Sequence, residues 1–127
     1  MKTRRLLIAI LCVSALAGCS RTQPVHNVSE TLNIHYSDVQ VKNAILQAGA
    51  DRQWVMQAAQ PGVINGHLAQ RGHAADIRIT YSGSQYQINY VGSQNLLAGS
   101  GKIHRNYNRW INNLDNQIQL RLAAQQK

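Results

Sequence analysis

Hydrophobic and polar residues alternate along the middle of the chain, over 52–91, with the period of two that is typical of strands with one buried face. This pattern predicts four consecutive strands. Their inward-facing residues are Trp54, Met56 and Ala58, then Ile64, Gly66 and Leu68, then Ala75, Ile77, Ile79 and Tyr81, and finally Tyr86, Ile88 and Tyr90. Short turns at 60–62 and 71–72 keep these faces on one side of an antiparallel meander, whereas two registers are open around 82–84.

Two other segments carry apolar residues at helical spacing. One helix is predicted at about 38–48, with Ser37 as N-cap, Gln40 completing a capping box and Gly49 ending it. A second is predicted at about 103–122, with an apolar stripe of Ile103, Tyr107, Trp110, Ile111, Leu114, Ile118 and Leu122. We therefore expect a two-layer α+β domain, in which a four-stranded antiparallel meander sheet carries both helices packed on one face.

The first nineteen residues have a different pattern. Three basic residues at positions 2 to 5 precede an apolar run over 6–16, and small residues then lead to Cys19. The apolar run is shorter than the roughly 20 residues that a membrane-spanning helix needs. We therefore expect a signal peptide that is removed from the protein.

The residues Leu16-Ala17-Gly18-Cys19 at the end of this segment resemble the lipobox of bacterial lipoproteins. The resemblance implies cleavage between Gly18 and Cys19, a diacylglyceryl group on the Cys19 sulfur and an acyl chain, such as palmitate, on its new amine. Two or more chains are enough for stable anchoring to a membrane. Ser20 stands where an aspartate would imply retention in the inner membrane, so the resemblance implies an outer-membrane lipoprotein that faces the periplasm.

These expectations divide the chain into a signal peptide at 1–18, a lipidated cysteine with a flexible tether at 19–30, and a single α+β domain at 31–127. The tether is expected because 20–30 is polar, contains Pro24 and shows neither periodicity. Within the next residues, 31–35 alternate again and are a candidate short edge strand. Cys19 is the one cysteine left after cleavage, so no intramolecular disulfide is expected.

The chain is basic. Its formal net charge of +8 falls to +5 when the basic residues of the signal peptide are removed. A basic surface suits nucleic acid, anionic lipid or acidic glycan, and the predicted compartment argues against nucleic acid. The expected partners are therefore the membrane that holds Cys19 and an envelope protein, an anionic glycolipid or peptidoglycan. The sequence pattern does not indicate an oligomeric state.

Several short motifs occur over about 39–120, namely Ala44-Ile45, Trp54, Gly62-Val63-Ile64, Arg71-Gly72-His73, Tyr86-x-Ile88-x-Tyr90, Ser93-x-Asn95-Leu96 and Ile103-His104-x-x-Tyr107-Asn108-x-Trp110-Ile111-x-Asn113-Leu114. In these residues the chain resembles a group of small outer-membrane lipoproteins of Gram-negative bacteria. The group brings no established activity or catalytic residue with it, so the resemblance supports the expected domain and compartment only.

Catalytic chemistry has few candidates in this sequence. His67 and Asp76 are expected to pair across two strands on the open face of the sheet, but no activated nucleophile accompanies them. His67, His73 and His104 lack metal-ligand spacing. Glu30 is assigned to the tether, which leaves no evident carboxylate pair for glycan hydrolysis. We therefore expect no enzyme, metal or cofactor, and a small envelope hydrolase that uses these histidines and Asp76 is the alternative.

The candidate binding surface is a stripe on the second predicted helix. Arg105, Arg109, Asn112 and Asn116 fall within about 60° of one another at 100° per residue. Such side chains bind phosphate, carboxylate and glycan hydroxyls through several hydrogen bonds at once. The sequence therefore favours a lipid-anchored lipoprotein with a non-catalytic domain that binds an envelope protein or an anionic envelope polymer. A structural lipoprotein that self-associates through its open sheet is a further alternative.

Overall fold

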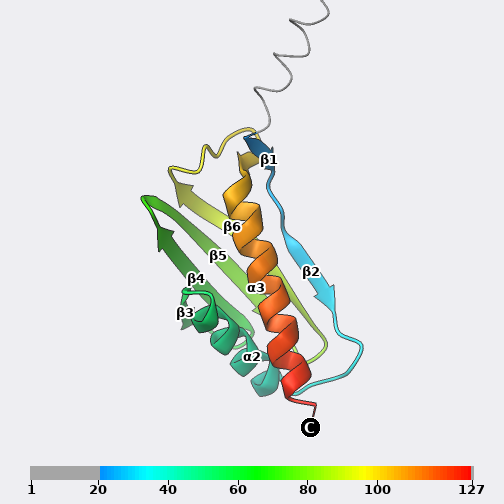
Figure 1. The fold of residues 1–127 in the computed structure, drawn as a ribbon. Coiled ribbons are helices and arrows are strands. Elements are labelled where there is room, and N and C mark those ends of the chain that lie inside the picture. The colour runs from blue at the N-terminus through cyan, green and yellow to red at the C-terminus, as the bar shows by residue number, and fades with distance from the viewer. Residues whose placement is uncertain (1–20, 127) are drawn as a thin grey trace, which may run out of the picture.

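The computed structural model describes residues 21–126, and Figure 1 shows their arrangement. The elements follow in the order β1 (Thr22–Pro24), β2 (Val28–Thr31), α2 (Asp38–Asp51), β3 (Val55–Ala58), β4 (Val63–Gln70), β5 (His73–Tyr81), β6 (Gln85–Gln94), β7 (Lys102–His104) and α3 (Arg105–Ala124). The predicted signal peptide and lipidation residue Cys19 lie outside the described residues.

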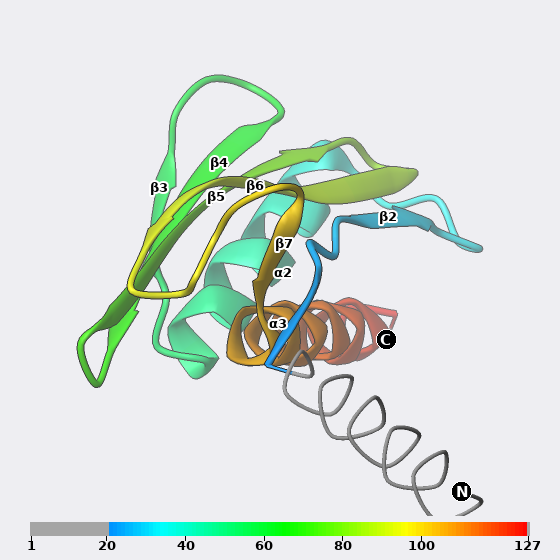
Figure 2. The same cartoon turned by 90° about the horizontal axis from the view of Figure 1, so that it is seen from above.

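The fold is α+β, as predicted, and both helices lie on the same face of the main sheet (Figure 2). The predicted count of four strands is too low. The main sheet has five strands in the order β2-β6-β5-β4-β3, all neighbours antiparallel, and β1 pairs with β7 in a separate two-stranded sheet. The four central strands were detectable because each alternates over several residues, whereas β2 has four residues and buries Val28 alone.

The registers of the central strands match the prediction. Ala58 lies opposite Ile64, and Leu68 lies opposite Ala75. The register that the sequence left open pairs Tyr81 with Tyr86 around a two-residue turn. The ladder between β5 and β6 shifts at Asp76, where a bulge places one extra residue in β6.

Helix α2 begins as predicted and ends later than predicted. The Ser37 hydroxyl accepts a hydrogen bond from the Gln40 amide, and the Gln40 side chain accepts one from the Ser37 amide, which completes the capping box. Gly49 does not end the helix. A Cβ added at Gly49 would clash with the Met56 side chain, so the glycine allows β3 to approach the helix. The left-handed residue after α2 is instead Gln53, with a φ of 67°.

Helix α3 begins two residues later than predicted, because 102–104 form β7 and pair with β1. The imidazole of His104 caps the helix by accepting a hydrogen bond from the Asn106 amide at 3.1 Å. The apolar stripe is where the sequence predicted it. Ile111, Leu114 and Ile118 are fully buried between the helix and the sheet.

The structure corrects the prediction of a flexible tether up to Glu30. We call 22–31, which contains β1 and β2, the N-terminal strap. The strap is tied to α3 by Asn108, whose side chain accepts from the His26 amide and donates to the Pro24 carbonyl, both at 3.0 Å. Short strands with one buried residue have no periodic signal, so polarity alone made this segment resemble a linker. The candidate edge strand at 31–35 is wrong, because the edge strand is β2, which ends at Thr31, and 32–35 are not in a strand.

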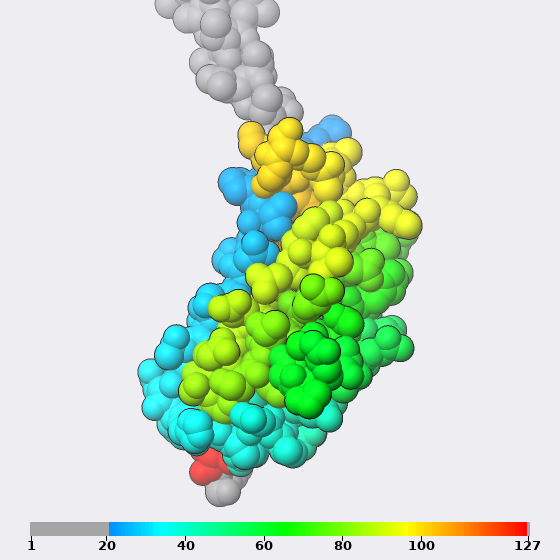
Figure 3. Space-filling view, turned by 180° about the vertical axis from the view of Figure 1, so that it is seen from behind, coloured from blue at the N-terminus to red at the C-terminus, as the bar shows by residue number. Residues whose placement is uncertain are grey.

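The described residues share one hydrophobic core between the sheet and the two helices. The opposite face of the sheet is left uncovered by helices, and it forms the surface seen in Figure 3. Within residues 21–126, no helix has the length and apolar character needed to cross a membrane.

Candidate binding groove

A groove runs between the first half of α3, the tip of the β4–β5 hairpin and the turn that joins α2 to β3. It consists of two adjoining hollows with volumes of about 420 and 250 Å³, lined by residues from 51–54, 68–73 and 106–113. Gln70, Arg71, Arg109 and Trp110 line both hollows, so the two are parts of one site. We refer to it as the groove.

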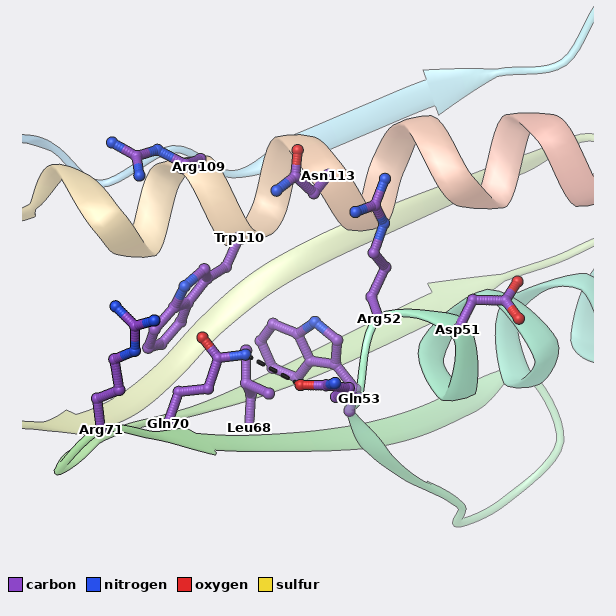
Figure 4. Close-up of a pocket in the computed structure, with 10 residues that line it drawn as sticks. Asp51, Arg52, Gln53, Leu68, Gln70, Arg71, Arg109, Trp110 and Asn113 are labelled. Carbon is purple, nitrogen blue, oxygen red and sulfur yellow. Dashed lines mark hydrogen bonds between the residues drawn. The ribbon is translucent and has the colours of Figure 1, made fainter.

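Three arginines from three different elements surround the groove. Arg52 follows α2, Arg71 lies at the hairpin tip and Arg109 belongs to α3 (Figure 4). All three are exposed, and within residues 21–126 none of them forms a salt bridge. Their guanidinium groups are therefore available to an anion, which arginine binds in a bidentate manner.

One carboxylate, that of Asp51, also lines the larger hollow. It already accepts two hydrogen bonds from the Arg121 guanidinium, at 2.7 and 2.8 Å, and one from the Gln117 amide at 2.8 Å. The Arg121 bonds first, and the Gln117 bond next, lower the pKa of Asp51. In Figure 4 the Asp51 carboxylate points away from the other labelled side chains. The charge of Asp51 is thus largely compensated by Arg121, and the groove stays cationic.

The floor of the groove is apolar and its rim is polar. Trp54 and Leu68 are buried beneath it, with exposed fractions of 4% and 3%. Trp110 is half-buried and comes from α3 toward the hairpin (Figure 4). At the rim, the Gln70 amide donates to the Gln53 side-chain oxygen at 3.2 Å. Most residues that line the groove are polar or charged, which suits a polar ligand.

The hairpin tip that carries Arg71 is held in place. Arg71 and Gly72 both have positive φ, 52° and 80°, which is the backbone of a two-residue type I′ turn. The Asn95 amide donates to the Gly72 carbonyl at 2.8 Å, and the His73 Nδ1–H donates to the Asn95 carbonyl at 2.6 Å. These bonds fasten the tip to the loop after β6, so Arg71 stands on a fixed wall of the groove.

The predicted Arg/Asn stripe is only partly in the groove. Arg105, Arg109, Asn112 and Asn116 are all exposed, but Arg109 alone among them lines it. Arg109 could be predicted because it lies on a helix, and helical periodicity shows which residues of one helix share a face. Arg52 and Arg71 were missed because only the packing of the hairpin and the α2–β3 turn beside α3 brings them near it.

The predicted pair of His67 and Asp76 is present. Their cross-strand register is as expected, and His67 Nδ1 lies 2.7 Å from the Asp76 carboxylate. The side chains are 50% and 53% exposed, as in an ordinary surface pair. His73 and His104 instead contact Asn95 and the start of α3. Residues 21–126 contain no cluster of three metal-ligating side chains.

Sequence reasoning missed a second group, because it placed Glu30 in the tether. Glu30 lies opposite Tyr86 in the sheet, and the Tyr86 hydroxyl donates to the Asp115 carboxylate and accepts from Gln119 at 2.8 Å. The pKa of Glu30 is raised, first because a hydrogen bond to Asp115 requires a proton and next because burial disfavours its charge. Burial, and then the Asp115 bond, raise the pKa of Tyr86. We call these four residues the Glu30 cluster.

Together, the fold and the groove describe a small α+β domain with a groove bordered by three arginines. Comparison of the chain with models of protein families, with curated proteins and with solved structures found no match. The groove and the N-terminal sequence therefore carry the functional proposal.

Proposed function

We propose that this chain is an outer-membrane lipoprotein, anchored through Cys19 and facing the periplasm, whose domain binds an anionic envelope polymer and catalyses no reaction. The basic and apolar segment that ends in Leu16-Ala17-Gly18-Cys19 supports the anchor. Phosphorylated glycolipid and peptidoglycan are the anionic polymers of that compartment. The groove supports the binding role.

The observation that carries the binding role is the set of Arg52, Arg71 and Arg109 around one groove. No carboxylate among the described residues forms a salt bridge with any of them. Like charges around one hollow repel one another and add nothing to folding stability. The same charges attract an anion and orient it through bidentate hydrogen bonds, because each comes from a separate, packed element.

The anchor is tested by replacing Cys19 with serine in the full chain. We expect Cys19→Ser to prevent labelling with radioactive palmitate and to leave the protein uncleaved or released from the membrane fraction. Cys12→Ser is the matched control, because Cys12 lies in the predicted signal and should not be lipidated. Normal labelling and membrane retention of Cys19→Ser would contradict the anchor and leave the binding role to be judged separately.

The binding role is tested with the protein purified from cells that express the full chain, in neutral detergent. The probes are isolated peptidoglycan sacculi and lipopolysaccharide micelles. We expect binding to at least one of them, weaker at high salt because ions screen exposed charges. The triple variant Arg52→Gln, Arg71→Gln and Arg109→Gln should bind at least about 30-fold more weakly, roughly 2 kcal/mol.

The matched control removes the same net charge elsewhere. Arg78, Lys102 and Arg105 are exposed, and none lines the groove or forms a salt bridge within residues 21–126. Changing these three to glutamine should alter binding by less than about threefold. Equal losses in the two triple variants would mean that net charge, and not the groove, is recognised. A protein that binds neither probe, or that is retained only by an envelope protein, would also contradict the proposal.

A further inference from the structure

Trp110 stands between the two hollows of the groove and lines both of them. Building on the proposed function, we infer that the groove binds an anionic oligosaccharide, with a pyranose ring stacked on the Trp110 indole and a phosphate or carboxylate held by the arginines. Charge alone would admit any anion, whereas stacking on Trp110 requires a ligand with a flat apolar face.

Trp110 packs partly against the core, and the part of its side chain that stays exposed lines the groove, where a ligand can stack on it. The side chain is half-buried although the neighbouring stripe residue Ile111 is fully buried. In Figure 4 its ring extends from α3 toward Arg71 and Gln70. An aromatic ring with an apolar face and a polar edge suits a partner that is apolar on one side and polar at its rim. A pyranose has that character, because its axial C–H groups form an apolar face.

The polar residues around Trp110 match hydroxyl groups as well as anions. Gln53, Gln70, Asn106 and Asn113 line the groove. An amide both donates and accepts hydrogen bonds, as a sugar hydroxyl does, whereas an arginine only donates. Within residues 21–126, the single side-chain bond between Gln70 and Gln53 leaves the Gln70 oxygen and the Gln53 amino group available to a ligand. A site for inorganic anions alone would have no use for these acceptors.

The size of the groove favours more than one sugar unit. The larger hollow, at about 420 Å³, lies within the roughly 300–1,000 Å³ range of small-molecule sites, and the smaller one of about 250 Å³ adjoins it. Arg71 and Arg109 border both hollows, whereas Arg52 borders the larger one alone. A chain that crosses Trp110 can therefore contact cationic groups on both sides of the ring.

The experiment compares the binding of anionic disaccharides with the binding of an anion that has no sugar ring. The probes are an N-acetylmuramic acid-containing disaccharide from peptidoglycan, a deacylated phosphorylated glucosamine disaccharide from lipopolysaccharide, and polyphosphate. We expect Trp110→Leu to weaken binding of at least one disaccharide by about tenfold, the scale of one lost aromatic contact, and to change polyphosphate binding by less than about twofold. Trp110→Phe retains an aromatic face and should stay within about threefold of the unsubstituted protein. Which disaccharide binds identifies the source of the sugar.

Trp110 is half-buried, so Trp110→Leu could also perturb folding. A second measurement in the unsubstituted protein avoids this problem. The indole N–H resonance of Trp110, identified by its absence from the spectrum of Trp110→Phe, should shift on titration with the disaccharide but not with polyphosphate. The oligosaccharide inference would be overturned if this resonance does not move, or if Trp110→Leu loses as much affinity for polyphosphate as for the disaccharide. It would also be overturned if a nucleoside monophosphate binds more tightly than the disaccharides. Unchanged binding of every probe by the arginine triple variant would instead overturn the proposed function.

Discussion

The two long sides of α3 differ in how their polar residues are paired, although on the groove side Arg121 and Gln117, near the end of the helix, bond to Asp51. On the side of the N-terminal strap, polar side chains have protein partners, as Asn108 bonds to the strap and Asp115 to Tyr86. On the side of the groove, Arg109 is exposed and forms no salt bridge within residues 21–126. Polar groups that hydrogen-bond to one another stabilise the fold, whereas unpaired cations around a hollow are available to an anionic ligand. The strap side therefore serves the fold, and the groove side is where we propose that an anion binds.

The largest effect is expected from Asn108→Ala on the strap side. Asn108 is 8% exposed, and the change removes its bonds to the His26 amide and the Pro24 carbonyl. We expect the free energy of unfolding, measured with urea, to fall by about 2–3 kcal/mol, because partly buried backbone groups lose their partners.

The matched control is Asn113→Ala, which changes the same residue type in the same helix on the groove side. Asn113 lines the groove, and its side chain makes no hydrogen bond among the described residues. Its replacement should change the free energy of unfolding by less than about 0.5 kcal/mol, and alanine is the better helix former. Similar losses in both variants would remove the distinction between the two sides.

The next largest change in the free energy of unfolding is expected at two buried tyrosines whose hydroxyl groups differ in hydrogen bonding. The Tyr86 hydroxyl bonds to Asp115 and Gln119, whereas the Tyr107 hydroxyl is buried without a hydrogen-bond partner among the described residues. We expect Tyr86→Phe to lower the free energy of unfolding by about 1–2 kcal/mol, and Tyr107→Phe to raise it by up to about 1 kcal/mol. Thermal unfolding of the two variants measures both values. A loss in Tyr107→Phe as large as that in Tyr86→Phe would show that its hydroxyl has a partner.

How much of this could be predicted from sequence depends on how local each signal is. The β4–β5 hairpin was predictable to the residue, because both strands alternate over many positions and a slip by one would expose Ile64 and Ile79. The start of α2 was predictable because Ser37 and Gln40 lie three residues apart. Patterns of this kind need only the residues of one or two adjacent elements.

The strap and the groove could not be found in this way. β2 buries Val28 alone, and Glu30 occupies the next inward position, so no apolar period marks the strand. The groove joins Arg52, Arg71 and Arg109, which are far apart in the sequence and come from different elements. Only the tertiary packing of the hairpin and of α2 beside α3 brings them together.

A smaller effect is expected from pH at the Glu30 cluster. The pKa of Glu30 is raised in the folded protein, so its contribution to stability is full below the ordinary value of 4.5 and is lost as pH rises through the raised value. Glu30→Gln should remove this loss, because a glutamine amide donates to Asp115 at any pH. We expect the variant to be more stable than the unsubstituted protein near pH 7, by less than about 1 kcal/mol because the pair is partly exposed.

Asp51→Asn provides the contrast from the other side of α3. The pKa of Asp51 is lowered by Arg121, so its contribution is present above the ordinary value of 3.8 and is lost as pH falls through the lowered value. Acid should therefore strengthen the contact of Glu30 and weaken that of Asp51. The free energy of unfolding is measured with urea between pH 3 and 7. It should fall less toward neutral pH in Glu30→Gln, and less toward acid pH in Asp51→Asn, than in the unsubstituted protein. If Glu30→Gln destabilises the protein at neutral pH, Glu30 does not share a proton with Asp115, and the strap is held there in some other way.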